Sequence, residues 1–203
     1  MHTKSYQKSR IIAWETLLRY DVRSLPVVLH CLMDQMGIRY YNYESGAKLI
    51  SAYHIEHLCQ NDGFTLLIHG RPFILYNNSI QPRQRIRFTI AHELGHILCG
   101  HSFCASGGVL HTRRNRGDLA QGDPREYEAN CFAMRLLSPS IVLHRIGVRS
   151  PEEIALLCGL SPAAAQCRAG RMAVLESRNN WLRQPLERRV DEQFAAFCAR
   201  WRS

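Results

Sequence analysis

The sequence predicts an α+β fold that is mostly helical, with one small antiparallel sheet in its first half and a helical region at its C-terminal end. Apolar residues recur at helical spacing along most of the chain, whereas strand-forming residues gather between positions 38 and 78. Proline-led helix starts repeat after residue 123. We therefore expect one domain over residues 1–140, and a helical region over residues 141–203 that packs on it or contacts a partner.

The composition is that of a globular protein with an excess of positive charge. The 203 residues are 46% hydrophobic and 21% charged, and 26 Lys and Arg against 17 Asp and Glu give a formal net charge of +9. This length suits one well-packed core with a small appendage. The charge favours acidic partners, with nucleic acid as the first candidate, although basic surface charge also serves solubility alone.

Several features predict a cytoplasmic protein. The first twenty residues lack the apolar core of a signal peptide. No run approaches the roughly 20 apolar residues of a membrane helix, so we expect no membrane contact. Eight cysteines lie scattered without a CxxC pair, several of them inside apolar helical patterns. That distribution is typical of free thiols in a reducing compartment.

The first eighty residues combine short helices with strands. The first forty residues predict two helices, the second with Pro26 in its first turn and Gly37 at its end. "IRYYNY" (38–43) predicts a strand, and "ISAYHIEHLCQ" (50–60) predicts a third helix. "GFTLLIHGRPFILYNN" (63–78) predicts a hairpin, because two apolar runs flank a turn that contains Gly70.

Two longer helices follow, separated by an irregular segment. Residues 83–99 have a helical apolar pattern, with Gly100 as a suitable C-cap. Residues 101–123 are rich in Gly and Arg, and unstructured segments of this length are typically functional or mobile loops, here long enough to cover a cleft. At Asp123 a new helix begins, with Pro124 in its first position and Glu126 where a capping box would need it. It ends at Ser138-Pro139.

The C-terminal third predicts four more helices. One covers 138–147, two begin at Ser150-Pro151 and Ser161-Pro162, and "LERRVDEQFAAFCARW" (186–201) predicts a single basic helix. The middle pair is similar to a helix-turn-helix, and Arg168 and further arginines follow it. However, "AAAQCRAG" offers few long polar side chains for contacting bases. We therefore expect this pair to contact a protein, with DNA binding and a purely structural role as alternatives.

The stretch "FTIAHELGHILCGH" (88–101) carries the chemistry. It places His92 and His96 four positions apart, with Glu93 directly after the first histidine. Residues four apart lie on one helix face, so both imidazoles can reach one ion about 2 Å away. Glu93 lies about 100° round the helix, too far to ligate easily but near enough to act on a water at the ion. This spacing predicts a zinc hydrolase site rather than an ordinary amphipathic helix.

A catalytic zinc usually has three protein ligands and a water, so the third ligand must come from elsewhere. The extended motif HExxHxxGxxH is not present, because positions 99 and 102 are Cys and Ser. "EYEAN" (126–130) offers Glu126 and Glu128. We favour Glu126, because Asn130 lies one turn further on the same face, where its amide can hold a ligand histidine. A capping role for Glu126, and Glu128 as the ligand, are the alternatives.

Together, "RFTIAHELGHILCGH" and "EYEANCFAMRLLSP" resemble the ImmA/IrrE family of gluzincin-type metallopeptidases, which are bacterial and often linked to phages or mobile elements. The resemblance covers about residues 83–140 closely and includes the preceding hairpin. It implies a zincin-like metallopeptidase domain over residues 1–140 with one zinc per chain. It also implies His92 and His96 as zinc ligands, Glu126 as the third ligand and Glu93 as the catalytic acid/base. Family members end the second motif in Leu-Leu-Met-Pro, where this chain has "LLSP".

The resemblance further implies a zinc-dependent endopeptidase that cleaves a regulatory protein, such as a helix-turn-helix repressor. The alternative is a DNA- or protein-binding regulator in which the zinc is structural or sensory. Tyr127, His101 and His111 are candidates for stabilising the oxyanion of the tetrahedral intermediate. Cys99, His101 and Cys104 can be considered as a second zinc site, although a buried thiol followed by loop residues is the simpler interpretation.

Overall fold

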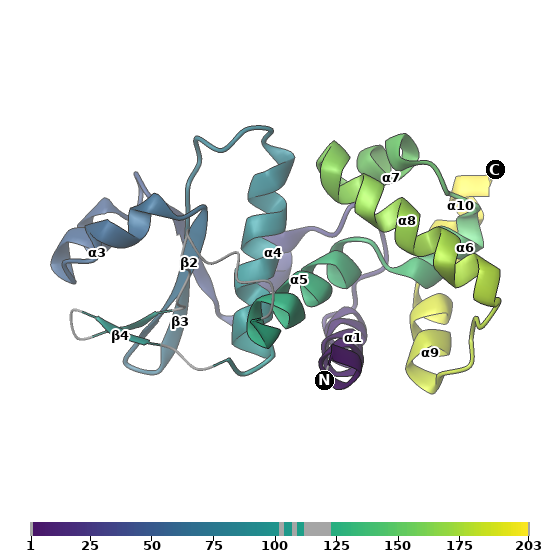
Figure 1. Ribbon diagram of the computed structural model, residues 1–203, viewed down its shortest axis with the longest axis horizontal. Helices are drawn as coiled ribbons and strands as arrows, with labels where there is room; N and C mark the ends of the chain where they lie inside the picture. Colours follow the sequence, from purple (N-terminus) through teal and green to yellow (C-terminus); the bar gives the residue numbers. More distant parts are fainter. Residues whose placement is uncertain (1, 102–103, 107–108, 112–122, 203) are drawn as a thin grey trace.

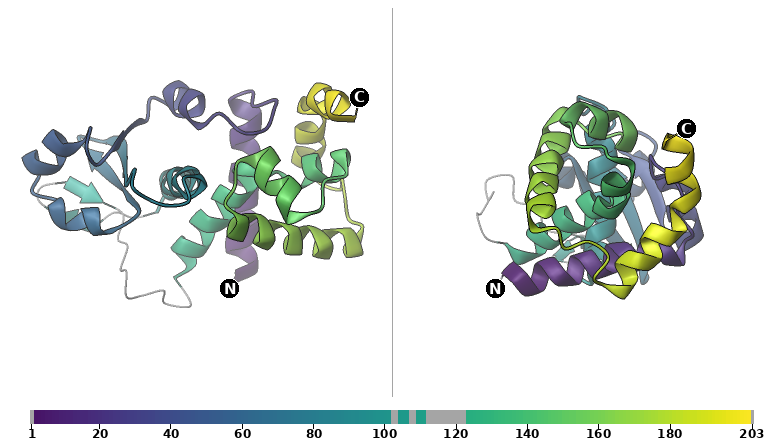
Figure 2. Two further views of the ribbon diagram at one scale, coloured as in Figure 1. Left: turned by 90° about the horizontal axis from the view of Figure 1, so that it is seen from above. Right: turned by 90° about the vertical axis from the view of Figure 1, so that its right-hand side faces the viewer.

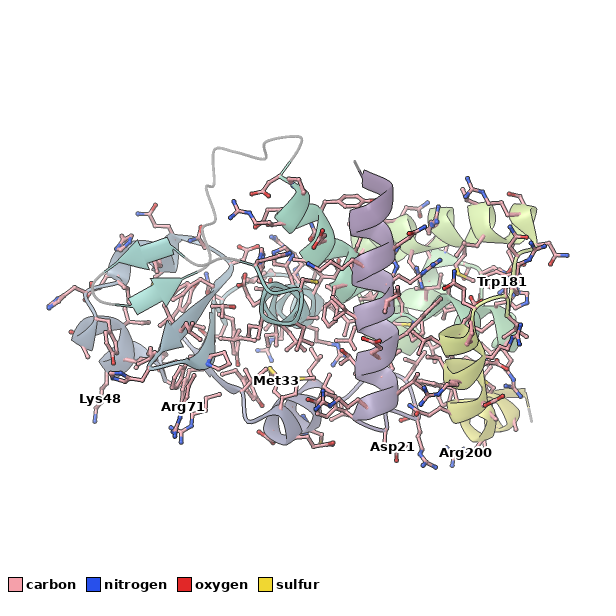
Figure 3. The ribbon with its side chains drawn as sticks, turned by 90° about the horizontal axis from the view of Figure 1, so that it is seen from below. Asp21, Met33, Lys48, Arg71, Trp181 and Arg200 are labelled. Atoms are coloured by element: carbon pink, nitrogen blue, oxygen red, sulfur yellow. The ribbon has the colours of Figure 1, made fainter. Side chains whose placement is uncertain are left out.

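The computed structural model describes residues 2–101, 104–106, 109–111 and 123–202 of the chain. The sheet and α3 lie at one end of an elongated molecule and α6–α10 at the other, with α1, α4 and α5 between them (Figure 1). The view from above shows the same order (Figure 2). Lys48 and Arg71 mark the sheet end, Trp181 and Arg200 the helical end, and Met33 lies near the middle (Figure 3). The predicted α+β class, mostly helical with a helical C-terminal region, is confirmed.

The sheet is mixed, with the order β1-β3-β2-β5-β4. Its strands are β1 (Arg39–Asn42), β2 (Gly63–Ile68), β3 (Arg71–Tyr76), β4 (Cys104–Ser106) and β5 (Val109–His111). β2 and β3 form the predicted hairpin, and the turn residues His69 and Gly70 both have positive φ, 48° and 75°, as a tight two-residue turn requires. The expectation of a purely antiparallel sheet is wrong in one respect, because β1 pairs in parallel with β3. β1 follows α2 and is not joined to β3 by a hairpin, so the connection does not require the two strands to be antiparallel.

Two short strands come from the segment that we expected to be irregular. β5 extends the sheet by pairing antiparallel with β2, and β4 extends it by pairing with β5, although glycines interrupt the apolar residues in the sequence "CASGGVLH". Residues 102–103, 107–108 and 112–122, which make up most of the segment 101–123 that was expected to cover a cleft, lie outside the described part of the chain.

The N-terminal helices follow the prediction with two changes. They are α1 (His2–Arg19), α2 (Leu29–Met36), α3 (Ala47–Ala52) and the 3₁₀-helix η1 (Glu56–Gln60). Pro26 does not lie in the first turn of α2, which starts three residues later, whereas Gly37 ends α2 at φ 67° as predicted. The third predicted helix is divided into α3 and η1 at His54, whose φ of 51° is incompatible with a continuous α-helix.

The centre of the molecule is the contact between α4 (Gln84–Leu98) and α5 (Pro124–Leu137). A Cβ on Gly95 would lie 3.1 Å from the Ala129 Cα atom and 3.0 Å from the ring of Phe132. The two helices therefore approach as closely as they do because residue 95 has no side chain. On the other side of α4, a Cβ on Gly63 would lie 2.6 Å from the Thr89 methyl group, so β2 also lies close to this helix.

The C-terminal helices are α6 (Ser140–Ile146), α7 (Pro151–Cys158), α8 (Pro162–Arg178), α9 (Pro185–Gln193) and α10 (Ala195–Arg202). α7 has the full capping box of Ser150 and Glu153, and Ser161 caps α8. The prediction of a single helix over 186–201 is wrong, because the helix is interrupted at Phe194, between α9 and α10. Phe194 is fully buried, so the break serves the packing of its ring in the core.

One hydrophobic cluster joins both ends of the chain. It contains Leu17 from α1, Leu94 from α4, Phe132 from α5, Ile154 from α7 and Val190 from α9. A smaller cluster fills the space between the sheet, α3 and η1. Helices on both sides of residue 140 therefore share a core. The division into a domain over residues 1–140 and a helical region over residues 141–203 stays a prediction. Within the described residues, no helix has the length and apolar character needed to cross a bilayer.

Candidate metal centre

The middle of α4 presents His92 and His96 on one face, one turn apart. Their side chains are almost fully buried, and their Nε2 atoms lie 2.9 Å apart. Two neutral imidazoles whose Nε2 lone pairs face each other in a dry setting repel, unless a proton or a cation lies between them. The geometry of α4 therefore creates a position that attracts a positive charge.

Glu126 reaches this position from the first turn of α5. Its Oε2 atom lies 3.2 Å from the Nε2 atom of His92, and its Oε1 atom lies 3.2 Å from the Nε2 atom of His96. Burial alone would raise the pKa of the Glu126 carboxyl, but hydrogen bonds and charge from the two histidines lower it well below its usual range. The carboxylate is therefore ionised at neutral pH.

These three side chains form a donor set suited to a divalent metal ion. Each offers one ligand atom, and the atoms all lie within 4.8 Å of one another. Ligand atoms about 2.1 Å from a tetrahedral ion lie roughly 3.4 Å apart, close to the separations of 2.9 and 3.2 Å found here. Two imidazoles and one carboxylate are a set that zinc accepts while keeping one position for water. The structure thus brings together the three residues that the sequence predicts as ligands.

Asn130 supports this cluster from α5, as expected. Its Oδ1 atom lies 2.9 Å from the Nδ1 atom of His92. An amide oxygen accepts only, so the Nδ1 atom of His92 carries a proton, and a neutral His92 would then offer its Nε2 lone pair to a metal ion. This bond holds the ring in an orientation suited to ligation. The alternative, a capping role for Glu126, differs from what is found, because Asp123 accepts from the backbone N–H of Arg125 while the Glu126 carboxylate faces the histidines.

Glu93 lies on another face of α4, against the sheet. Its side chain is buried, and the Thr65 hydroxyl of β2 donates to its Oε2 atom over 3.0 Å. Glu93 does not belong to the group of three potential ligands. Sequence reasoning missed Thr65, since nothing in the hairpin pattern indicates which strand residue faces a helix 28 positions later. A buried carboxylate in a fixed orientation is suited to accept a proton from a nearby reactant.

A second polar cluster lies directly behind His96. Gly100, at φ 69°, turns the chain back after α4 and brings His101 against His96, with 2.9 Å between their Nδ1 atoms. The Nε2 atom of His101 lies 3.1 Å from the Oε2 atom of Glu128. Burial lowers the pKa of His101, and its hydrogen bond to Glu128 opposes that effect only in part. Glu128, the alternative third ligand, therefore contacts His101 and not the group formed by His92, His96 and Glu126.

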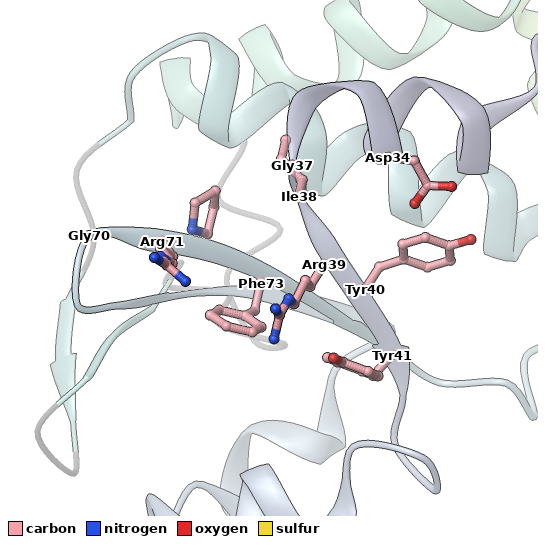
Figure 4. A pocket seen from close by; sticks show the side chains of 10 residues that line it. Asp34, Gly37, Ile38, Arg39, Tyr40, Tyr41, Gly70, Arg71 and Phe73 are labelled. Carbon is pink, nitrogen blue, oxygen red and sulfur yellow. The ribbon is translucent and has the colours of Figure 1, made fainter.

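Among the described residues, the group of potential ligands around His92 does not include Tyr127. Tyr127 is 37% exposed on α5 beside Glu126. The side chains of Cys104 and His111 lie outside the described part of the chain. A separate surface pocket of about 600 Å³ lies between the end of α2, β1 and the hairpin turn, and Arg39, Arg71 and Phe73 are among the residues that line it (Figure 4). None of the predicted site residues lines this pocket.

Comparison with known proteins agrees with this geometry. The model of the Peptidase_M78 family, described as the IrrE N-terminal-like domain, matches residues 33–169. The chain belongs to this family. The resemblance to ImmA/IrrE proteins is thus confirmed, and the M78 match includes α4, α5 and both polar clusters. A search of curated proteins found no match to the chain.

Membership of the M78 family and the His/Glu cluster together support a metallopeptidase, and a peptidase acts on a protein substrate. The match continues beyond residue 140, through α6 and α7 into α8.

Proposed function

We propose that this protein is a zinc-dependent endopeptidase that cleaves a regulatory protein, with a helix-turn-helix repressor as the expected substrate. The observation that carries the proposal is the convergence of His92, His96 and Glu126, from two helices, on one position. The buried Glu93 directly follows His92 on α4. Two imidazoles and a carboxylate would hold one zinc ion per chain. A bound zinc ion supplies Lewis acidity and lowers the pKa of its water toward about 7.

The residues of the chain take distinct roles in this proposal. Glu93 accepts the proton of the water that attacks the peptide carbonyl, and then delivers that proton to the leaving amine. Thr65 donates to the Oε2 atom of Glu93 and so holds the carboxylate in one orientation. Asn130 fixes the ring of His92 so that its Nε2 atom faces the ion. Burial of α4 keeps bulk water away from the histidines, which strengthens each of these interactions.

Metal content tests the ligand set. The purified protein should hold about one zinc per chain, and His92→Ala and His96→Ala should each lose it, because two ligands cannot retain the ion tightly. His30→Ala is the matched control, since His30 is exposed on α2 and should leave the metal content unchanged. Equal zinc content in all four proteins would reject the site.

Cleavage tests the chemistry. Glu93→Gln should keep its zinc yet lose cleavage of a co-expressed repressor by about 10²-fold or more, because the ligands remain while the base is gone. Glu152→Gln, an exposed change of the same type on α7, should cleave normally. If the Glu93→Gln variant relieves repression in cells as fully as the wild type, the protein acts by binding the repressor rather than by cleaving it. Where a repressor is encoded next to this gene, it is the substrate to try first.

A DNA-binding regulator is the alternative, and particular observations weigh against it. Arg168, which follows the helix-turn-helix pattern, is 3% exposed and donates to the carbonyl of Ser138, so it does not face solvent. The turn between α7 and α8 is itself covered, because a Cβ on Gly159 would lie 3.1 Å from the Arg87 side chain of α4. A salt-dependent gel shift at physiological ionic strength would revive DNA binding.

A further inference from the structure

The two histidines of the cluster are supported in different ways. His92 contacts the neutral, solvent-exposed Asn130, whereas His96 contacts a second imidazole that contacts a carboxylate. That carboxylate, Glu128, in turn lies 3.4 Å from the Nζ atom of Lys8 on α1. Four side chains from three parts of the chain, α1, α5 and the end of α4, thus form one continuous series of polar contacts that begins at His96.

The positions of the protons along this series follow from a single condition. If the Nε2 atom of His96 ligates a metal ion, as the proposed function requires, its lone pair is there and its only proton is on Nδ1. That N–H donates to the Nδ1 atom of His101, 2.9 Å away, which must then carry a lone pair. The proton of His101 is therefore on Nε2, and it donates to Glu128 over 3.1 Å. Every contact then joins one donor to one acceptor.

The opposite arrangement fails at the metal. With its proton on Nδ1, His101 would donate to His96, and the proton of His96 would move to Nε2, the atom that faces Glu126. Glu128 prevents this arrangement, because a carboxylate accepts a hydrogen bond and so retains the Nε2 proton on His101. The Nζ atom of Lys8 contacts the same carboxylate from α1.

A second metal site is the competing interpretation, since Cys99, His101 and Glu128 also place ligand atoms within 4.8 Å of one another. Three observations oppose it. Both ring nitrogens of His101 already have partners, in His96 and Glu128. The Lys8 ammonium group donates to the Cys99 carbonyl and contacts Glu128, which places a positive charge where the cation would bind. Burial also raises the pKa of the Cys99 thiol to about 11, so it is not a thiolate at neutral pH.

Stability alone does not account for these residues. His101 and Glu128 are 7% and 9% exposed, and replacing buried charged groups by apolar ones of similar volume is often neutral or stabilising. Orienting His96 accounts for the buried pair of His101 and Glu128, whereas packing alone does not. We propose that His101 and Glu128, with Lys8 behind them, are positioning residues that fix the tautomer and the ring orientation of His96 for metal binding. This inference rests on the proposed function.

We call the series of contacts from His96 through His101 and Glu128 to Lys8 the relay. Zinc affinity, measured by competition with a chromophoric chelator, tests its role. His101→Leu should weaken zinc binding by about 10- to 100-fold, the range for lost support of a ligand histidine. His101→Gln should restore most of the affinity, because an amide offers one acceptor and one donor. Glu128→Leu should resemble His101→Leu, and the double variant should lose little more than either alone, because both act through His96. Unfolding in urea with a chelator present shows whether each variant folds.

The tautomers can be observed without any variant that risks misfolding. Long-range ¹H–¹⁵N spectra of the zinc-loaded wild-type protein should show the proton of His96 on Nδ1 and that of His101 on Nε2. A His101 proton on Nδ1 would overturn the relay even if zinc binds.

The possible failures are distinguishable from one another. If the wild-type protein holds no zinc, the proposed function fails and the relay fails with it. If zinc is lost in His92→Ala but His101→Leu binds it as tightly as the wild type, the relay alone is wrong. Two zinc ions per chain, reduced to one in His101→Leu, would also overturn the relay and establish the second metal site instead.

Discussion

Gly95→Ala is the substitution with which the structure can be tested most directly, because it changes one methyl group at the contact between α4 and α5. Gly95 lies between the two proposed ligand histidines in "HELGH", on the face of α4 that packs against Ala129 and Phe132. Glu126 is one turn before Ala129 on α5. Any separation of the helices at this point therefore also moves the carboxylate away from the histidines.

Two effects of opposite sign decide the outcome. Alanine in place of glycine inside a helix stabilises the fold by about 0.5–1 kcal/mol, because it restricts the unfolded chain. The new methyl group would lie 3.1 Å from the Cα and O atoms of Ala129 and 3.0 Å from the ring of Phe132, and both residues are fully buried. Backbone atoms in a closed core cannot move aside freely, and such overpacking costs about 1–3 kcal/mol. We expect a net loss of up to about 2 kcal/mol.

Urea unfolding with a chelator present measures this loss without a contribution from metal binding. Gly170→Ala is the matched control, because Gly170 is exposed in the middle of α8 and a Cβ there meets nothing within 4 Å. It should gain about 0.5–1 kcal/mol. Zinc affinity should fall about tenfold in Gly95→Ala, the size typical of a disturbed supporting contact, and remain unchanged in Gly170→Ala.

The reasoning fails if Gly95→Ala is as stable as the wild type or more so and binds zinc equally well. In that case α4 and α5 would tolerate a wider separation, and the close approach of the two helices would not position Glu126.

Three further predictions concern other parts of the molecule. Asn130→Ala should weaken zinc binding by about 10- to 100-fold, whereas Asn130→Asp, which keeps an acceptor for His92, should lose much less in the same chelator competition. Burial raises the pKa of Glu187, so the unfolded chain releases this proton first and stability falls as pH rises from about 4.3 toward the higher folded-state pKa. Glu187→Gln should remove that fall in urea unfolding at a series of pH values, and an unchanged pH dependence would contradict the assignment. Iodoacetamide at about pH 7.5 should modify the exposed Cys31 in the folded protein but not Cys158, because burial raises the pKa of the Cys158 thiol to about 12. Mass spectrometry of the labelled peptides measures this, and labelling of Cys158 as early as Cys31 would contradict it.

The helices and their ends were the most predictable part of the fold. Asp123, Ser150 and Ser161 cap the helices that the sequence assigned to them, and Gly37 ends α2 in the left-handed conformation. Caps, turns and helical periodicity depend on hydrogen bonds and side-chain contacts within about four residues, so a single sequence contains the information. The errors, at α3–η1 and at Phe194, lie where packing of the core overrides an uninterrupted local pattern.

For the candidate site, the sequence by itself determined that His92 and His96 share one face of a helix, because that follows from the helical repeat alone. It also narrowed the third ligand to two glutamates in "EYEAN". Only the tertiary structure placed Glu126 at the histidine pair and Glu128 at His101. It alone brought Thr65 to Glu93 and Lys8 to Glu128, across 28 and 120 positions of the chain. The physical reason is that such contacts depend on how closely α1, α4, α5 and the sheet pack, which short-range periodicity does not specify.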